Sequence, residues 1–131
     1  MFRFNEKMER DKARTLNPIA LAFVGDAVYS LFVREKLIFS CDKKIGEVNK
    51  MASNEVRASA QAEFYRRISD ILNEEENGVF HRARNAKKAT KAKSATVAEY
   101  NISTGIEAVL GYLYIIGDFE RLNFILNEGK V

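Results

Sequence analysis

One stretch of the sequence reads Ile19-Ala-Leu-Ala-Phe-Val-Gly-Asp26-Ala-Val-Tyr-Ser-Leu-Phe-Val33 and contains a single charged residue, Asp26. A second stretch reads Ile102-Ser-Thr-Gly-Ile-Glu107-Ala-Val-Leu-Gly-Tyr-Leu-Tyr-Ile-Ile116 and contains a single charged residue, Glu107. Short alternating runs with turn pairs between them, which would indicate strands, are missing, whereas helical spacing is common. We therefore predict an all-α domain in which these two helices are buried on several sides.

The helix boundaries follow from capping residues and breaks. Asn17 is a good N-cap and Pro18 fits the first turn, so a helix is expected from there to about residue 39. After a break at 40–42, a helix is expected to about residue 51 and another, capped by Ser53, to about residue 67. Further helices are expected over about 69–82, 96–116 and 119–127, with a loop at 85–94.

Length and composition exclude several classes of protein. The 131 residues fit one domain, and 47% hydrophobic with 30% charged residues is an ordinary globular balance rather than that of a disordered chain. The single cysteine, Cys41, excludes an internal disulfide framework and is expected to be a packing residue. One cysteine with one histidine, His81, cannot build a Cys/His zinc site, and a Ser-His-Asp triad would need that same histidine, which lies among arginines.

No targeting or membrane segment is visible in the sequence. Residues 1–12 carry charges of both signs without an apolar core, unlike a secretory signal. The uncharged stretches are about half as long as the roughly 20 residues that a membrane-spanning helix needs. We therefore expect a soluble, cytoplasmic protein.

The two lone acids suggest a metal site. Burying an unpaired carboxylate costs several kcal/mol or shifts its pKa, so Asp26 and Glu107 each need a partner. One turn before and after each acid lie only small residues, namely Ala22 and Ser30 around the first and Ser103 and Gly111 around the second. If these faces meet, the gap suits a hydrated Mg²⁺ ion and a phosphate, and metal-assisted phosphodiester hydrolysis follows. The alternative is that each acid faces solvent or pairs with an arginine such as Arg34 or Arg57.

A basic segment at residues 81–93 accounts for the positive charge of the protein. It contains no acid and six basic residues, Arg82, Arg84, Lys87, Lys88, Lys91 and Lys93. Without these six of the 21 basic residues, the chain would have 15 against 18 acidic ones, a net charge of −3. Clustered cations favour an anionic partner, and the absence of aromatic residues favours the phosphates of a duplex over stacking on unpaired bases. A solvated charged loop and an acidic protein partner remain the alternatives.

Several motifs carry a family resemblance. Phe23-Val-Gly-Asp26-Ala-Val28 resembles the signature helix of the ribonuclease III family, and Thr104-Gly-Ile-Glu107-Ala-Val-Leu-Gly111 resembles its second acidic motif. An ordered set of motifs spanning about residues 16–127 is similar to the bacterial Mini-ribonuclease III subfamily, which consists of the catalytic domain alone. That set comprises Leu21–Tyr29 with Arg34, then Arg82-Ala-Arg-Asn-Ala-Lys87, then Glu107–Tyr112 and Gly117-Asp118-Phe-Glu-Arg-Leu122.

The resemblance implies a helical ribonuclease III endonuclease domain over residues 1–131, without a double-stranded-RNA-binding domain. It also implies a homodimer whose shared valley holds an RNA duplex. The implied activity is Mg²⁺-dependent cleavage of double-stranded regions in structured RNA, leaving 5′-phosphate and 3′-hydroxyl ends, with the 23S ribosomal RNA precursor as substrate. Asp26 and Glu107 then correspond to catalytic acids and Mg²⁺ ligands. The RNA-binding residues are expected to be Arg82, Arg84, Asn85, Lys87, Lys88, Lys91 and Lys93.

The chain departs from the larger family members at three acidic positions. Ile19 and Ala22 stand where those enzymes carry glutamates, and Thr104 stands where they carry an aspartate. Two carboxylates leave more of the metal shell to water and phosphate, so we expect one Mg²⁺ per subunit and a second that binds only with substrate. The alternative is a non-catalytic RNA-binding or ribosome-associated protein of the same fold, and a helical protein-interaction module is a third possibility.

Overall fold

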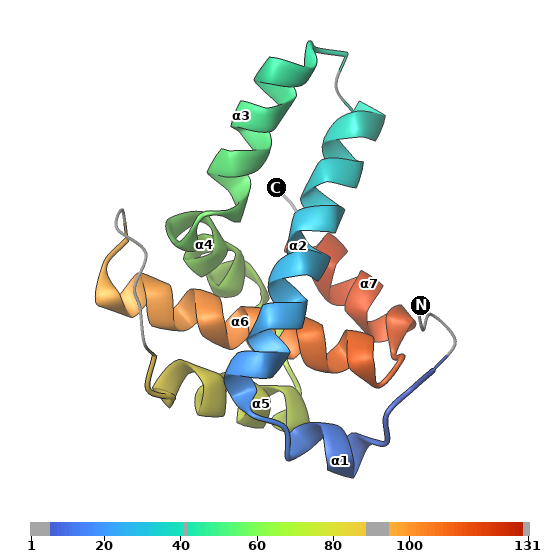
Figure 1. The fold of residues 1–131 in the computed structure, drawn as a ribbon, viewed down its shortest axis with the longest axis vertical. Helices are drawn as coiled ribbons and strands as arrows, with labels where there is room; N and C mark the ends of the chain where they lie inside the picture. Colours follow the sequence, from blue (N-terminus) through green and yellow to red (C-terminus); the bar gives the residue numbers. More distant parts are fainter. Residues whose placement is uncertain (1–5, 41, 89–94, 130–131) are drawn as a thin grey trace.

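The computed structural model describes residues 6–40, 42–88 and 95–129, in which every regular element is a helix (Figure 1). This confirms the all-α prediction. The α-helices are α1 (Arg10–Arg14), α2 (Pro18–Ser40), α3 (Ile45–Val56), α4 (Ala58–Ile68), α5 (Glu74–Asn85), α6 (Val97–Ile115) and α7 (Phe119–Glu128), and Ser69–Ile71 forms a 3-10 turn. Among the described helices, none has both the length and the hydrophobicity needed to cross a bilayer.

Helix α6 forms the centre of the domain. Helices α2, α4 and α5 pack against it, and α2 crosses it (Figure 1). Helix α3 lies beside the C-terminal half of α2. Residues along α6 from Ser103 to Leu113 are buried, apart from Glu107, which is half-buried, so the prediction of burial on several sides is confirmed for this helix. The core around it includes Leu21, Phe64 and Phe80.

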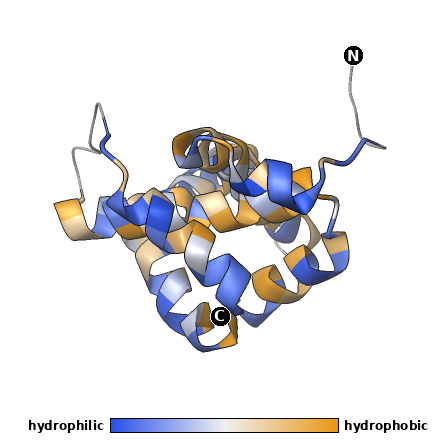
Figure 2. Cartoon of the chain, turned by 90° about the horizontal axis from the view of Figure 1, so that it is seen from below, coloured by the Kyte–Doolittle hydropathy of each residue, from blue (hydrophilic) through white to orange (hydrophobic). Residues whose placement is uncertain are grey.

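Helix α2 is buried on one side, and its other apolar face is open to solvent in this single chain. Phe23 is 81% and Phe39 85% exposed, and Leu31 and Ile38 are also exposed. The opposite face, with Leu21, Val33 and Leu37, is buried in the core. The apolar content of α2 thus exceeds what the packing of this single chain uses. Figure 2 shows the chain coloured by hydropathy, with hydrophobic and hydrophilic residues mixed along its helices.

Two predicted helix boundaries are wrong. Ser53 lies inside α3, and the break comes at Arg57, whose backbone is extended (φ −68°, ψ 158°). Helix α5 begins after Asn73 rather than at 69–70, because Asn73 and Glu76 form a reciprocal capping box that satisfies two free backbone donors. The short helix α1 was not predicted. Capping by Thr96 and by Asp118 places the starts of α6 and α7 close to the predicted positions.

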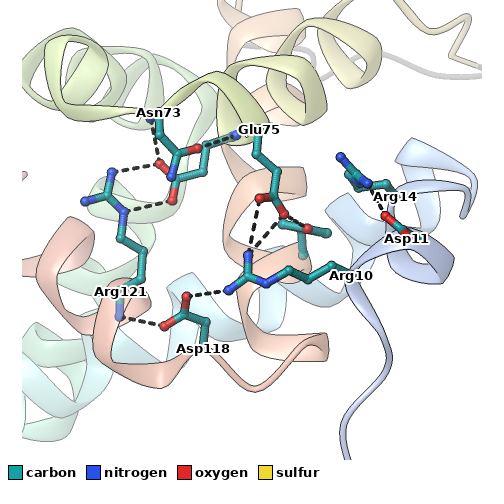
Figure 3. Close-up of polar contacts among 9 residues, drawn as sticks. Arg10, Asp11, Arg14, Asn73, Glu75, Asp118 and Arg121 are labelled. Atoms are coloured by element: carbon teal, nitrogen blue, oxygen red, sulfur yellow. Dashed lines mark hydrogen bonds and ion pairs between the residues drawn. The ribbon is translucent and has the colours of Figure 1, made fainter.

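A polar network joins α1, α5 and α7 (Figure 3). The Arg10 guanidinium donates to Glu75 at 3.1 Å and to Asp118 at 3.1 Å. Arg121 donates to both carboxylate oxygens of Glu76 at 2.8 Å, and Glu76 is only 1% exposed. The arginine therefore compensates a buried charge that would otherwise be costly.

Candidate active site

Two glycines allow α2 and α6 to touch backbone to backbone. A Cβ atom on Gly25 would lie 1.6 Å from the Glu107 carbonyl oxygen, and one on Gly111 would lie 1.9 Å from the Leu21 carbonyl oxygen. No other residue type fits either position without moving a helix. Because Asp26 follows Gly25 and Glu107 is itself the residue in contact, the crossing places these two acids next to each other.

The two carboxyl groups interact directly. The pKa of Glu107 is raised to about 8, first by burial and then by hydrogen bonding to and repulsion from Asp26, while a hydrogen bond from Gln61 opposes the shift. Glu107 is half-buried and Asp26 is exposed, so the pair reaches from the helix crossing to the solvent. Two acids that are far apart in the sequence are thus brought together, and in the described part of the chain neither forms an ion pair with an arginine as Glu76 does with Arg121.

Asp26 and Glu107 line a cleft of about 690 Å³. Its walls come from α2, the α3–α4 junction, α4, α6 and the segment after α5. Ile19, Ala22 and Thr104 line it together with Ser103. Arg57, Lys87 and Lys88 also line the cleft, so positive groups and the carboxylates share its walls. An anionic ligand placed there would meet cations on its flanks.

Gln61 is a cleft residue that the sequence analysis did not identify. Gln61 on α4 is 2% exposed, and its Nε2 atom donates to the Val56 carbonyl oxygen at 2.7 Å and to Glu107 Oε2 at 3.2 Å. Its position could have been a signal, because Gln61 shares a helix face with the buried Phe64 and Ile68. A polar residue on such a face calls for a hydrogen-bonding partner from elsewhere in the chain.

The predicted RNA-binding residues occupy different surroundings. Lys87 is exposed at the cleft, whereas the Lys88 ammonium donates to the carbonyl oxygens of Arg84 (3.0 Å) and Ala86 (2.8 Å), and burial lowers its pKa. Lys88 therefore caps the C-terminal end of α5.

Arg82 and Arg84 have local partners too. Arg82 is not among the cleft residues, and its guanidinium donates to the carbonyl oxygens of Arg14 and Leu16 between α1 and α2. The Arg84 guanidinium lies 5.7 Å from the Phe80 ring centre and donates to Asn85 Oδ1. Lys91 and Lys93 lie outside the described residues. The RNA-binding role of this set stays a prediction.

The acid pair suits a divalent cation. No group of three or more His, Cys, Asp or Glu side chains arranged for a metal occurs in the described part of the chain, and the acids that line this cleft are Asp26 and Glu107. Burial first and then the neighbouring Asp26 raise the pKa of Glu107, so its ionised form is disfavoured without a counter-ion. Mg²⁺ is commonly held by one or two carboxylates, with water and substrate phosphate oxygens completing its shell. The donor set fits this ion.

Comparisons with known proteins identify the family of this chain. Residues 19–118 match the family model for the ribonuclease III domain. The chain belongs to the ribonuclease III family. The matched region contains both acids of the pair, both glycines of the helix crossing and Gln61. Membership places the chain among endoribonucleases, which are phosphodiester hydrolases.

Within the ribonuclease III family, the chain belongs to the Mini-ribonuclease 3 group. It is 44% identical to Mini-ribonuclease 3 of Thermoanaerobacter sp. (strain X514) over 121 residues, which are 92% of this chain and 85% of that protein. It is 41% identical to Mini-ribonuclease 3 of Clostridium tetani over 92% of this chain and 81% of that protein. A crystal structure of a Fusobacterium nucleatum protein superposes with a TM-score of 0.79 at 33% identity, covering 87% of this chain and 91% of that one.

Proposed function

We propose that this ribonuclease III family enzyme is a Mg²⁺-dependent endoribonuclease that cuts double-stranded regions of structured RNA, with Asp26 and Glu107 as its catalytic acids. The observation that carries the proposal is the meeting of these two carboxyl groups at the helix crossing, in a cleft that Lys87 and Arg57 also line. A phosphodiester bound in this cleft would meet basic side chains and an acid pair that can bind a metal ion.

Asp26 and Glu107 would hold the ion, and Mg²⁺ would supply activation of water and neutralisation of charge developing on the phosphate. Glu107 binds a cation only in its ionised form, and the hydrogen bond from Gln61 favours that form. The exposed position of Asp26 leaves room for substrate oxygens. Lys87 would hold a neighbouring phosphate in place. Attack of water on phosphorus breaks the bond to O3′, giving 5′-phosphate and 3′-hydroxyl ends.

The proposal includes a homodimer that shares the RNA. The exposed apolar face of α2, containing Phe23, Leu31 and Ile38, is more hydrophobic than a monomer surface requires. A two-fold contact through this face would place two clefts on one assembly, each able to cut one strand. Sedimentation velocity tests this. Wild type should sediment as a dimer and Leu31→Asp as a monomer, and a monomeric wild type would contradict the contact.

The proposed substrate is the 23S ribosomal RNA precursor in the cytoplasm, cut by a single catalytic domain spanning residues 1–131. Arg82, Arg84, Asn85, Lys87, Lys88, Lys91 and Lys93 would contact phosphates collectively. One Mg²⁺ per subunit would bind at the acid pair, with a second entering only with substrate. Incubating the purified protein with this precursor, with and without Mg²⁺, and mapping the RNA ends tests the substrate.

Two nearly isosteric variants test the acid pair. Asp26→Asn and Glu107→Gln should each abolish cleavage while RNA binding stays close to wild type, because each removes one charge and little volume. Cleavage is followed on a labelled duplex, and binding is followed by fluorescence anisotropy. Full activity in either variant removes that residue from the catalytic site.

A second candidate is a non-catalytic RNA-binding protein of the same fold. It is favoured by the cleft positions Ile19, Ala22 and Thr104, which lack the acids of larger relatives. A Mg²⁺ titration with the labelled duplex separates the two candidates. Binding without cleavage at every Mg²⁺ concentration would favour the non-catalytic protein.

A further inference from the structure

Gln61 carries a buried hydrogen-bond acceptor without a partner. Its Oε1 atom is enclosed by the protein and has no hydrogen-bond partner among the described residues. Leaving a buried polar group unpaired costs about 1–3 kcal/mol, and most such groups in folded proteins are satisfied. An apolar side chain of the same size would avoid this cost on a helix face shared with Phe64 and Ile68. The presence of glutamine here therefore needs a reason.

The orientation of the amide is fixed by its neighbours. The Val56 carbonyl oxygen can only accept, so the nitrogen of Gln61 must face it at 2.7 Å. The same nitrogen reaches Glu107 Oε2 at 3.2 Å. The oxygen is consequently turned to the remaining side of the amide. Almost no surface of this oxygen is open to water, so Nε2 is the atom of Gln61 that acts on the acid site.

We propose that Gln61 is a positioning residue for the metal site, whose Nε2 fixes the Glu107 carboxylate, and that this contact is the reason a glutamine is kept here despite its unpaired oxygen. This inference rests on the proposed function, because it assumes that Asp26 and Glu107 bind Mg²⁺. A neutral amide suits the task better than lysine or arginine, since it orients a carboxylate without cancelling the charge that attracts the ion. Fixing one ligand in advance matters most where the protein supplies only two.

A purely structural role for Gln61 would be to cap the C-terminal end of α3 by donating to the Val56 carbonyl oxygen. The chain contains a matched example, because Asn77 Nδ2 donates to the Leu72 carbonyl oxygen at 3.2 Å, also five residues back in the sequence. Asn77 is not among the residues lining the acid cleft. Replacing each amide by its nearest apolar isostere, Gln61→Met and Asn77→Leu, removes the same kind of amide–carbonyl bond. Only the first change also removes the contact with Glu107.

The test is Mn²⁺ binding to the RNA-free protein, measured by the loss of the free Mn²⁺ signal in electron paramagnetic resonance. We expect Gln61→Met to raise the Mn²⁺ dissociation constant by about tenfold or more, the usual effect of removing a partner of a metal ligand. Asn77→Leu should leave it unchanged. Thermal unfolding in EDTA reports the structural effect of each variant separately from its effect on metal binding.

A second variant at the same position keeps the test decisive if Gln61→Met does not fold. Gln61→Asn keeps the amide but withdraws it by one carbon–carbon bond, about 1.5 Å, and should weaken Mn²⁺ binding in the same way. A folded variant at position 61 with wild-type Mn²⁺ affinity, alongside a wild type that binds Mn²⁺ and cleaves RNA, overturns this inference alone. A wild type without saturable Mn²⁺ binding overturns both the inference and the proposed metal site.

Discussion

The contact between Gly25 and the backbone of α6 allows a sharp prediction for Gly25→Ala. The added Cβ atom would lie 1.6 Å from the Glu107 carbonyl oxygen, 2.5 Å from its carbonyl carbon and 2.9 Å from the Gly111 nitrogen. All three atoms belong to the backbone of a central helix, so no side chain can turn away. Reaching even 3.0 Å from the oxygen requires α2 and α6 to separate by about 1.4 Å along that direction.

The expected cost of Gly25→Ala is about 3 kcal/mol or more, the upper part of the range for overpacking, because both helices are held by further neighbours. For a domain of this size that corresponds to a fall in melting temperature of roughly 10 °C or more. The separation would also pull Asp26 from Glu107, so the Mn²⁺ affinity of the surviving folded protein should fall. Circular dichroism at 222 nm measures the melting temperature.

Gly78→Ala is the matched control, because Gly78 is exposed inside α5 and a Cβ atom there meets nothing within 4 Å. It should be neutral or stabilising by up to about 1 kcal/mol, since alanine is the better helix former. A Gly25→Ala protein that melts within 2 °C of wild type would refute the backbone contact, and with it the geometry on which the acid pair depends.

Three further predictions concern charge. In metal-free buffer, the unfolding free energy should decrease as pH rises from about 5 to about 8, because the folded protein keeps the Glu107 proton up to its raised pKa of about 8 while the unfolded chain releases it near 4.5. Urea unfolding in EDTA at both ends of this range measures the slope, which Glu107→Gln should flatten. Arg121→Met should cost about 3 kcal/mol by leaving the buried Glu76 uncompensated, and adding Glu76→Gln should recover most of the melting temperature. Neutralising Lys87, Lys88, Lys91 and Lys93 together should weaken RNA binding and flatten its salt dependence, whereas Lys43→Ala with Lys44→Ala should do neither. Unchanged affinity of the first protein would exclude the basic segment as an RNA contact.

Local signals predicted most of the helices. Thr96 and Asp118 mark helix starts because a side-chain oxygen can satisfy free backbone donors within its own turn. The same rule misplaced one boundary, because Ser53 is a good cap by type but lies inside α3. The actual break at Arg57 coincides with the bond from Gln61 to the carbonyl oxygen of Val56, which is a contact between two helices. A sequence pattern within one helix does not contain that information.

The basic segment illustrates a second limit. Its composition predicts an anionic partner, yet Arg82 and Lys88 already donate to backbone carbonyl oxygens in the folded chain. Charge can be counted along a sequence, but whether a cation also closes a helix or joins two segments depends on which carbonyl groups end up nearby. The exposed apolar face of α2 is similar, since the sequence shows the hydrophobic residues but not which of them the core leaves uncovered.

The sequence by itself determined the helical class, the two lone acids and the family motifs around them, because periodicity, capping and side-chain type are local properties of the chain. Only the tertiary structure decided that Asp26 and Glu107 interact, that Gly25 and Gly111 are the points of backbone contact, and that Gln61 joins the site. The physical reason is that these contacts join residues of different helices. Their distances are set by how close two backbones can approach, which no single helix specifies.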